Sequence, residues 1–321
     1  MIRAWLAALT AALIATAAAA QGSYPDKPVR FIVGFTAGSA TDITARLFAQ
    51  KFQEAWNVPV TVENVPGAGG SVGGDRVAKS APDGTTFYWG ANGALTINPT
   101  LLTSQTYDVQ RDLQPVVRLL VMPSILAVNN DVPATSFAEF VALAKAQPGK
   151  LNYASAGAGS GIHLGTVLFA EAAGIEITHV AYKGSGPALT DLLGGHVQMY
   201  FSSLPPAIGL VKEGKLRALG VTGLKRSASF PDVPTVAEQG LPGFEAVLHY
   251  GIVAPAGTPR PIVDKLNVAL RAALGDPKVH GHIATEGAEP LPTSPEEYAA
   301  DIDREETKWS ALVRKSGAQA K

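Results

Sequence analysis

The sequence predicts an α/β protein built from two lobes, and three observations support this fold class. Short runs rich in β-branched residues alternate with amphipathic segments from residue 29 onward, which is typical of parallel strands covered by helices. The chain has 321 residues, about twice the length of an average domain. It has 33 glycines where average usage predicts roughly 22, so several glycine-rich loops are expected. With 46% hydrophobic residues, the chain can bury a core, which excludes a disordered protein.

The individual elements follow from this alternation. Runs of β-branched and aromatic residues predict strands over 29–35, 60–62, 86–89, 151–154, 178–181, 198–201 and 247–253. Apolar residues spaced three and four apart predict helices over 43–56, after 67–74, and over 137–147, 162–173, 187–193, 262–274 and from 295 onward. Since each strand is followed by a helix, parallel sheets covered on both faces are expected.

Signals at the helix ends support these assignments. Ser136 and Glu139 form a capping box, and the helix that they open ends at Pro148-Gly149. Ser294 is an N-cap followed by a proline, and Glu297 stands at the third helical position. Both helices are therefore expected to begin at a defined residue.

The N-terminus is predicted to be a secretory signal peptide. A short basic region with Arg3 precedes an apolar, alanine-rich stretch, and Ala18-Ala19-Ala20 fits a cleavage site. Cleavage is expected after Ala20, which removes residues 1–20 and exports the rest. The stretch is short and rich in alanine for a membrane span, and the chain has no cysteine for a lipid anchor.

Charge and cysteine content exclude several classes of function. The 26 basic and 27 acidic residues leave a net charge of −1, so no nucleic-acid partner is expected. The absence of cysteine excludes disulfides, thiolate-bound zinc and a cysteine nucleophile. His280 and His282 lie in a polar segment and are weak evidence for a metal, so neither a metal site nor a cofactor is predicted.

Three loops share a design that suits the binding of a small anion. Each follows a strand, is rich in Gly, Ser or Thr and leads into a helix; they cover 35–42, 155–163 and 182–187. At the carboxyl ends of parallel strands, such loops present unpaired backbone N–H groups and the positive ends of helix dipoles. Carboxylate and phosphate both fit, while ordinary loop and N-cap chemistry remains the alternative for any one loop.

Three side chains in these loops have two interpretations each. Asp42 either complements the first turn of its helix or reaches a ligand amine or water. His163 is either a structural histidine or a functional one, and Lys183 either pairs with a ligand carboxylate or is solvated. The sequence leaves these alternatives open.

Enzyme signatures are incomplete. Gly159 stands where a nucleophile elbow requires serine, and no phosphate-binding loop or zinc-protease motif is present. Ser160 and His163 are three residues apart at a helix start, which permits a periplasmic hydrolase as an alternative, but no orienting acid is identifiable. Binding without covalent chemistry is therefore the leading hypothesis.

Seven strings resemble one protein family in order along nearly the whole mature chain. They are Tyr24-Pro25-Asp26-Lys27-Pro28-Val29-Arg30 leading into 31–42, Glu63-Asn64-Val65-Pro66-Gly67-Ala68-Gly69-Gly70, Ala81-Pro82-Asp83-Gly84, Tyr153-Ala154-Ser155-Ala156-Gly157 with His163-Leu164, Tyr182-Lys183-Gly184, Pro234-Thr235-Val236-Ala237-Glu238 and Ala254-Pro255-Ala256-Gly257-Thr258-Pro259. Together they resemble the Bug family, the extracytoplasmic solute-binding proteins of tripartite tricarboxylate transporters.

The resemblance implies a fold, a ligand class and a partner. It implies the type II periplasmic-binding-protein fold, with lobe I over 24–122 and 246–321 and lobe II over 123–245, and a ligand cleft between them. It implies a periplasmic receptor, without enzymatic activity or cofactor, that captures a small carboxylate and delivers it to the membrane subunits of the transporter. A sensor kinase ectodomain is the alternative partner.

The resemblance also assigns residues to the two walls of the cleft. One wall would consist of Thr36, Ala37, Gly38, Ser39 and Asp42; the other would consist of Ser155, Gly159, Ser160, His163, Tyr182, Lys183 and Gly184; Asn92 and Ser203 are further candidates. The chain departs from the family at 37–39, where many members have Pro-Gly-Gly, at 202–203, where an acidic residue is frequent, and at 249–250, where a tryptophan is common. These departures leave the ligand's identity open.

Overall fold

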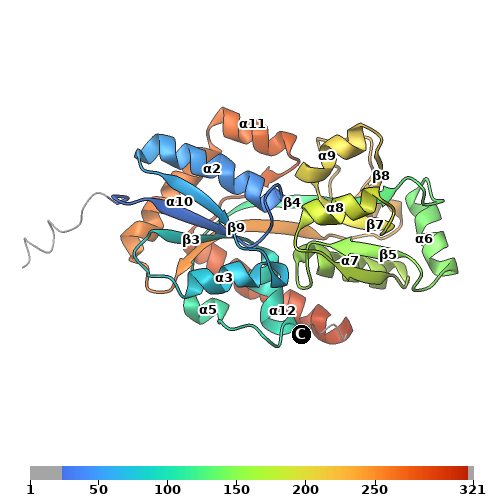
Figure 1. Cartoon of the computed structure of the whole chain (residues 1–321), viewed down its shortest axis with the longest axis horizontal. Coiled ribbons are helices and arrows are strands. Elements are labelled where there is room, and N and C mark those ends of the chain that lie inside the picture. The colour runs from blue at the N-terminus through green and yellow to red at the C-terminus, as the bar shows by residue number, and fades with distance from the viewer. Residues whose placement is uncertain (1–23, 317–321) are drawn as a thin grey trace, which may run out of the picture.

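The computed structural model describes residues 24–316, so the predicted signal peptide lies outside the described residues. The described chain forms two α/β lobes (Figure 1). One lobe combines the first and last parts of the sequence, coloured blue to teal and orange to red, while the other contains the middle, in green and yellow. The prediction of two α/β lobes is confirmed.

The first lobe is built on three parallel strands. They are β1 (Val29–Val33), β2 (Val60–Asn64) and β3 (Thr86–Ala91), and β1 pairs in parallel with both neighbours. Helix α2 (Ala40–Trp56) packs on this sheet, where the ring of Phe31 lies 5.5 Å from that of Trp89 and 5.8 Å from that of Phe52. Phe48 and Phe52 are buried on this side, whereas Ile43 and Leu47, which lie on the apolar face that the spacing predicts, are only partly buried.

The second lobe repeats this arrangement. Its parallel strands are β5 (Asn152–Ser155), β6 (Thr178–Ala181) and β7 (Met199–Ser203), with β5 pairing with both others. Each strand leads into a helix, as the alternation in the sequence predicts: α7 (Gly161–Ala173), α8 (Ser185–Leu193) and α9 (Leu204–Lys212).

Two long strands join the lobes and correct the expectation of purely parallel sheets. Strand β4 (Leu113–Asn129) pairs antiparallel with β9 (Val247–Pro255) up to Pro123, and with β7 and β8 (Leu216–Val221) from Ser124 onward. Strand β9 also pairs antiparallel with β3. The chain crosses between the lobes on β4 and returns on β9, so these neighbours run in opposite directions. Strand β4 was not predicted, because it lies outside the regular alternation of short strands and amphipathic helices that marks the other strands.

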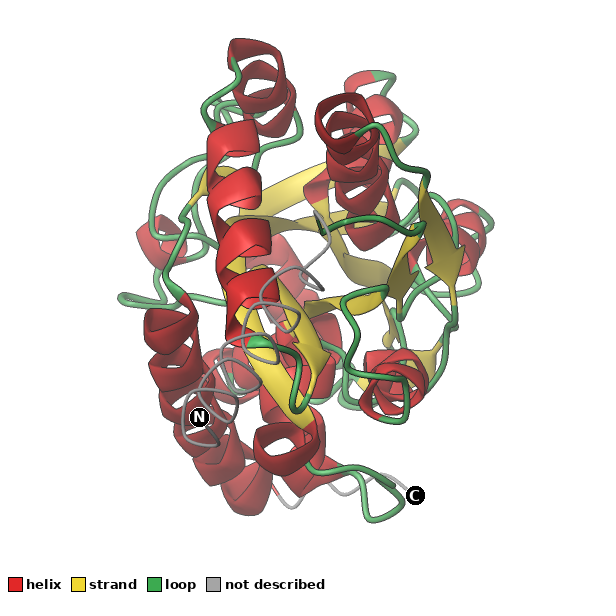
Figure 2. Ribbon diagram, turned by 90° about the vertical axis from the view of Figure 1, so that its left-hand side faces the viewer, coloured by secondary structure: helices red, strands yellow, loops and turns green. Residues whose placement is uncertain are grey.

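The remaining helices cover the sheets, and Figure 2 shows helices on both sides of the strands. They are α3 (Ser71–Ala78), α4 (Asn98–Leu101), α5 (Val109–Asp112), α6 (Phe137–Ala146), α10 (Arg260–Leu274), α11 (Pro277–Thr285) and α12 (Pro295–Ser316); a π-helical turn, η2, spans Gly93–Ile97, and β10 (Glu289–Pro290) pairs with β4. Ser136 is confirmed as the N-cap, since its Oγ accepts the Glu139 N–H at 3.2 Å, but the Glu139 carboxylate accepts the N–H of Thr135 at 2.6 Å in place of the Ser136 N–H that a capping box requires. The strand predicted over 29–35 ends at Val33, because the chain turns there into the loop before α2. Within residues 24–316, no helix is both long and apolar enough to cross a bilayer.

Candidate functional site

Four helices begin at one small cavity between the lobes. Helix α2 follows Ser39, α7 follows Ser160, α8 follows Gly184 and α9 follows Ser203. The cavity has a volume of about 20 Å³ and is lined on the side of lobe I by Phe35, Ser39, Ala40, Thr41 and Ala91, with Leu248 and Tyr250 from β9. On the side of lobe II it is lined by Ala156, Ser160, Gly161, Ile162, Ser185 and Ser203.

The polar groups at this cavity are neutral donors. None of the described residues that line it is charged. Ser39 Oγ accepts the N–H of Asp42 and Ser160 Oγ accepts that of His163, so the two serines cap their helices. The first two N–H groups of α2, at residues 40–41, and of α7, at residues 161–162, have no acceptor in the described chain. Unpaired N–H groups and converging helix dipoles favour an anion.

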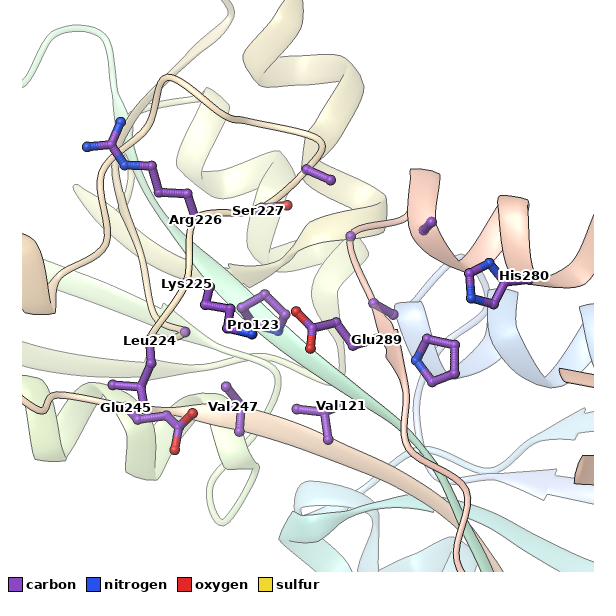
Figure 3. Close-up of a pocket in the computed structure, with 16 residues that line it drawn as sticks. Val121, Pro123, Leu224, Lys225, Arg226, Ser227, Glu245, Val247, His280 and Glu289 are labelled. Carbon is purple, nitrogen blue, oxygen red and sulfur yellow. The ribbon is translucent and has the colours of Figure 1, made fainter. Parts of the chain in front are cut away.

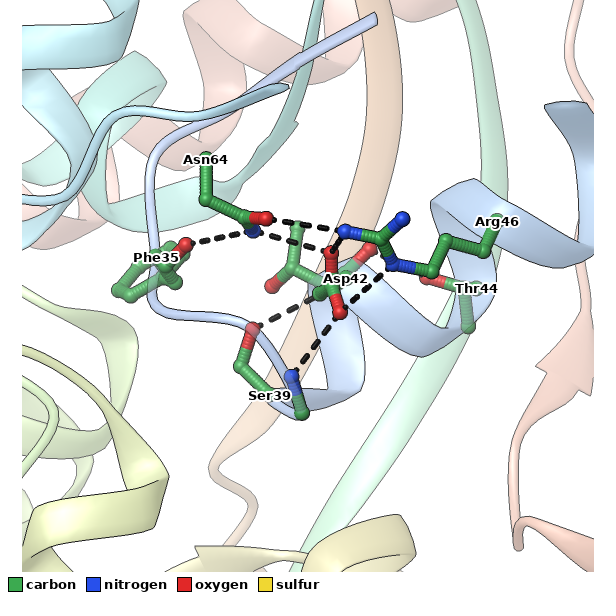
Figure 4. A network of polar contacts seen from close by, with 8 residues as sticks. Phe35, Ser39, Asp42, Thr44, Arg46 and Asn64 are labelled. Atoms are coloured by element: carbon green, nitrogen blue, oxygen red, sulfur yellow. Dashed lines mark hydrogen bonds and ion pairs between the residues drawn. The ribbon is translucent and has the colours of Figure 1, made fainter. Parts of the chain in front are cut away.

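Asp42 holds the first loop in place (Figure 4). Its carboxylate accepts the Gly38 N–H at 2.9 Å, Arg46 Nε at 3.0 Å and Asn64 Nδ2 at 2.9 Å. Asn64 Nδ2 also donates to the carbonyl of Phe35. Burial alone would raise the pKa of the Asp42 carboxyl, but the hydrogen bonds from Arg46, Gly38 and Asn64 outweigh it and lower the pKa. Asp42 does not line the cavity, so the structure places it as a support for the loop.

His163 supports the second loop from behind. Its Nδ1 accepts the Gly159 N–H at 3.2 Å, and its ring stacks on His179 with centroids 4.0 Å apart. Burial, and then the neighbouring His179, lower the pKa of His163 to about 3; burial lowers the pKa of His179 to about 4. His179 Nε2 lies 2.6 Å from Ser155 Oγ. Both imidazoles are therefore neutral near pH 7 and act as parts of the lobe's interior.

The geometry does not favour a Ser160–His163 catalytic pair. Ser160 Oγ donates to the carbonyl of Gly157 at 2.7 Å and accepts the backbone N–H of His163. The His163 ring nitrogen Nδ1 is occupied by Gly159. Within the described residues no hydrogen bond joins the hydroxyl to the imidazole, as general-base activation requires.

The third predicted loop contributes Ser185 to the lining of the cavity, while Tyr182 and Lys183 do not line it. Tyr182 Oη donates to Asp191 at 2.6 Å, and burial followed by this hydrogen bond raises the pKa of Tyr182 to about 12. Lys183 is exposed and has no ion-pair partner among the described residues. Ser185 lines the cavity and accepts a hydrogen bond from Tyr200 Oη at 3.0 Å.

The other residues assigned from the resemblance lie around the cavity without lining it. Ala37 and Gly38 are exposed, while Thr36 Oγ1 is buried and has no hydrogen-bond partner among residues 24–316. Asn92 Nδ2 donates to the carbonyl of Val247 at 3.4 Å, and its buried Oδ1 has no partner in the same range. Gly159 and Gly184 face the opposite lobe rather than the cavity.

Sequence reasoning missed several lining residues. Thr41 and Ser185 belong to two of the three predicted loops. Their positions in the first turns of α2 and α8 could have indicated that they line the cavity. Leu248 and Tyr250 come from the crossing strand β9; the resemblance marked 249–250 only as a departure from the family, and local sequence patterns do not place that strand at the three loops.

A larger hollow of about 380 Å³ lies on the opposite face of the crossing strands (Figure 3). Its floor includes Val121, Pro123 and Val247, and its walls carry Lys225 and Glu289. Val247 and Leu248 are neighbours on β9, so their side chains point to opposite faces. None of the three predicted loops reaches this hollow. Nor do the described residues contain a group of three or more His, Asp or Glu placed to hold a metal ion.

Comparison with known proteins finds one matching family model and several similar solved structures. Residues 44–318 match the model of the tripartite tricarboxylate transporter family receptor. The periplasmic binding protein BugD is 34% identical, with a TM-score of 0.88 over 93% of this chain and 100% of its own. Rpa4515 of R. palustris, solved with adipate, is 35% identical, with a TM-score of 0.89 over 92% of this chain and 99% of its own. MatC from Rhodopseudomonas palustris, solved with bound malate, is 33% identical, with a TM-score of 0.85 over 90% of this chain and 100% of its own.

Proposed function

Since the chain belongs to the receptor family of tripartite tricarboxylate transporters, with Bug proteins among its relatives, we propose that it captures a small carboxylate in the periplasm and delivers it to such a transporter. The alanine-rich N-terminus predicted to be a signal peptide supports this location. None of these observations favours a sensor kinase ectodomain as the partner.

One observation carries the proposal: four helix N-termini meet at a cavity that has no charged side chain. A carboxylate there is stabilised by N–H groups and hydroxyls that are fixed before it binds, so little reorganisation is needed. The lining also includes apolar side chains, among them Phe35, Ile162 and Leu248, which suit the carbon chain of the ligand. We assign the anion to the first turns of α2 and α7 and the hydroxyls of Ser185 and Ser203.

Ligand entry requires the lobes to separate. A volume of about 20 Å³ holds a group the size of one water molecule, whereas malate and adipate have many more heavy atoms. We place the hinge where β4 exchanges β9 for β7 and β8, at Pro123 and Ser124. Within the described residues this gives one lobe of 24–122 with 246–316 and another of 123–245. Contacts from both lobes to one ligand then favour the closed state.

A thermal-shift screen of small carboxylates tests the proposal, with adipate and malate first because two relatives were solved with them. A ligand at about 100 times its Kd adds roughly 2.7 kcal/mol of apparent stability, which raises Tm by several degrees. Stoichiometric recovery of the intact compound distinguishes a receptor from a hydrolase. No shift with any carboxylate in a broad panel contradicts the proposal.

A further inference from the structure

Backbone touches backbone where the lobes meet beside the cavity. Gly69 and Gly93 come from lobe I, on the turn before α3 and in η2, and Gly159 lies in the second loop of lobe II. A Cβ atom added to Gly69 would lie 2.6 Å from Gly159 C and 2.7 Å from Ser160 N. A Cβ atom added to Gly93 would lie 2.7 Å from the carbonyl oxygen of Gly159. These distances are below those that real Cβ atoms adopt, and backbone cannot rotate away as a side chain can.

Asn98 fixes the side of this contact that belongs to lobe I. Its Nδ2 donates to the carbonyl of Ala68 at 2.9 Å and to Ser71 Oγ at 2.7 Å, so the amide is held in one orientation. Its Oδ1 is buried, has no hydrogen-bond partner in the part of the chain that the structure describes, and lies against Gly159. Closure therefore removes an amide oxygen from water without replacing its hydrogen bond, which opposes closure.

We propose that Gly69, Gly93 and Gly159 form a latch between the lobes that sets how far the cleft closes, and that the buried Oδ1 of Asn98 opposes closure without preventing it. The latch residues do not line the cavity, so they act on affinity through closure alone. The expected effect on ligand affinity rests on the proposed function, whereas the expected effect on closure does not.

Two alanine substitutions test the latch, each with a matched control. Gly69→Ala places a Cβ against lobe II at a φ of +60°, and Gly214→Ala introduces the same kind of backbone strain at +70° with no atom within 4 Å. Gly93→Ala places a Cβ against Gly159, and Gly209→Ala is a helical control with no atom within 4 Å. The first pair keeps the test valid if Gly93→Ala fails to fold.

Closure is measured directly as a distance between spin labels. The chain has no cysteine, so Ala142→Cys on α6 and Val268→Cys on α10, both exposed, accept one label each. The wild type is expected to show the short distance between the labels that corresponds to closed lobes. Gly69→Ala and Gly93→Ala should show only a longer distance, while both control variants should show the short one. Titration with adipate and with malate should show at least tenfold weaker binding for the two latch variants, mainly through faster dissociation.

The outcomes separate the latch from the receptor proposal. Latch variants that keep the short distance overturn the latch, as does a wild type that never shows one. If neither adipate nor malate binds the wild type, the ligand class is in question, but the distances of the ligand-free proteins still decide the latch.

Discussion

Thr36 and Gly184 meet across the cleft: a Cβ atom added to Gly184 would lie 2.2 Å from Thr36 Oγ1. The hydroxyl belongs to the loop before α2 and the glycine to the loop before α8. Thr36 Oγ1 is buried, and none of the described residues forms a hydrogen bond with it. A buried hydroxyl without a partner beside an anion-binding cavity is a candidate donor to the ligand.

Replacing that hydroxyl should weaken binding. Thr36→Val keeps the shape of the side chain and removes the donor, so we expect Kd for the carboxylate identified by the screen to rise about tenfold, or about 1.4 kcal/mol. Isothermal titration measures the change, with Thr190→Val on the exposed face of α8 as the control. An unchanged Kd would assign Thr36 to interlobe packing alone.

Recognition by neutral donors predicts that Lys183 contributes little. Lys183 is exposed and does not line the cavity, so Lys183→Ala should raise Kd by less than about threefold. Gly159→Val should abolish binding, because Gly159 already lies against Asn98 and has a φ of +78°. Loss of binding in Lys183→Ala would refute recognition by neutral donors, whereas retention of binding in Gly159→Val would show that the contact between Gly159 and Asn98 is not needed for closure.

Asp42 should matter more than an ordinary surface ion pair. Asp42→Asn removes the charge that Arg46, Gly38 and Asn64 share, and we expect a loss of about 1–2 kcal/mol in the free energy of unfolding, with weaker ligand binding. Asp264→Asn is the matched control, since Asp264 also pairs with an arginine four residues away but is exposed. Its expected effect is below about 0.5 kcal/mol. Equal losses measured by urea unfolding would show that Asp42 has no special role in the loop.

The stacked histidines should make the protein acid-sensitive. Their pKa values fall from 6.5 in the unfolded chain to about 3 for His163 and about 4 for His179. As pH drops below 6.5 the unfolded chain binds protons first, so the free energy of unfolding decreases, by roughly 2–3 kcal/mol for one such histidine at pH 4. Urea unfolding between pH 7 and pH 4 measures this slope.

A variant identifies the source of that slope. His163→Gln should flatten the pH dependence, whereas His280→Gln, at an exposed position of α11, should leave it unchanged. If His163→Gln keeps the slope of the wild type, other groups are responsible for the acid sensitivity.

Much of this protein follows from local sequence patterns. Alternating strands and helices, the capping serines and the glycine-rich loops each depend on residues within a few positions of one another. Ser39 and Ser160, for example, each accept the N–H three residues ahead in the helix that they cap, and parallel strands bring the ends of such helices to one edge of a sheet. The two-lobed fold and an anion-binding edge were therefore predictable.

The tertiary structure decided which residues meet. Asn64 reaches Asp42 from 22 residues away, Leu248 and Tyr250 enter the cavity on a returning strand, and Asn98 meets Gly159 across the two lobes. Local propensity and periodicity carry no information about such distant partners, because they depend on how β4 and β9 cross and on how closely the lobes pack. The sequence by itself determined the kind of site, while the packing of the lobes decided its lining and its closure.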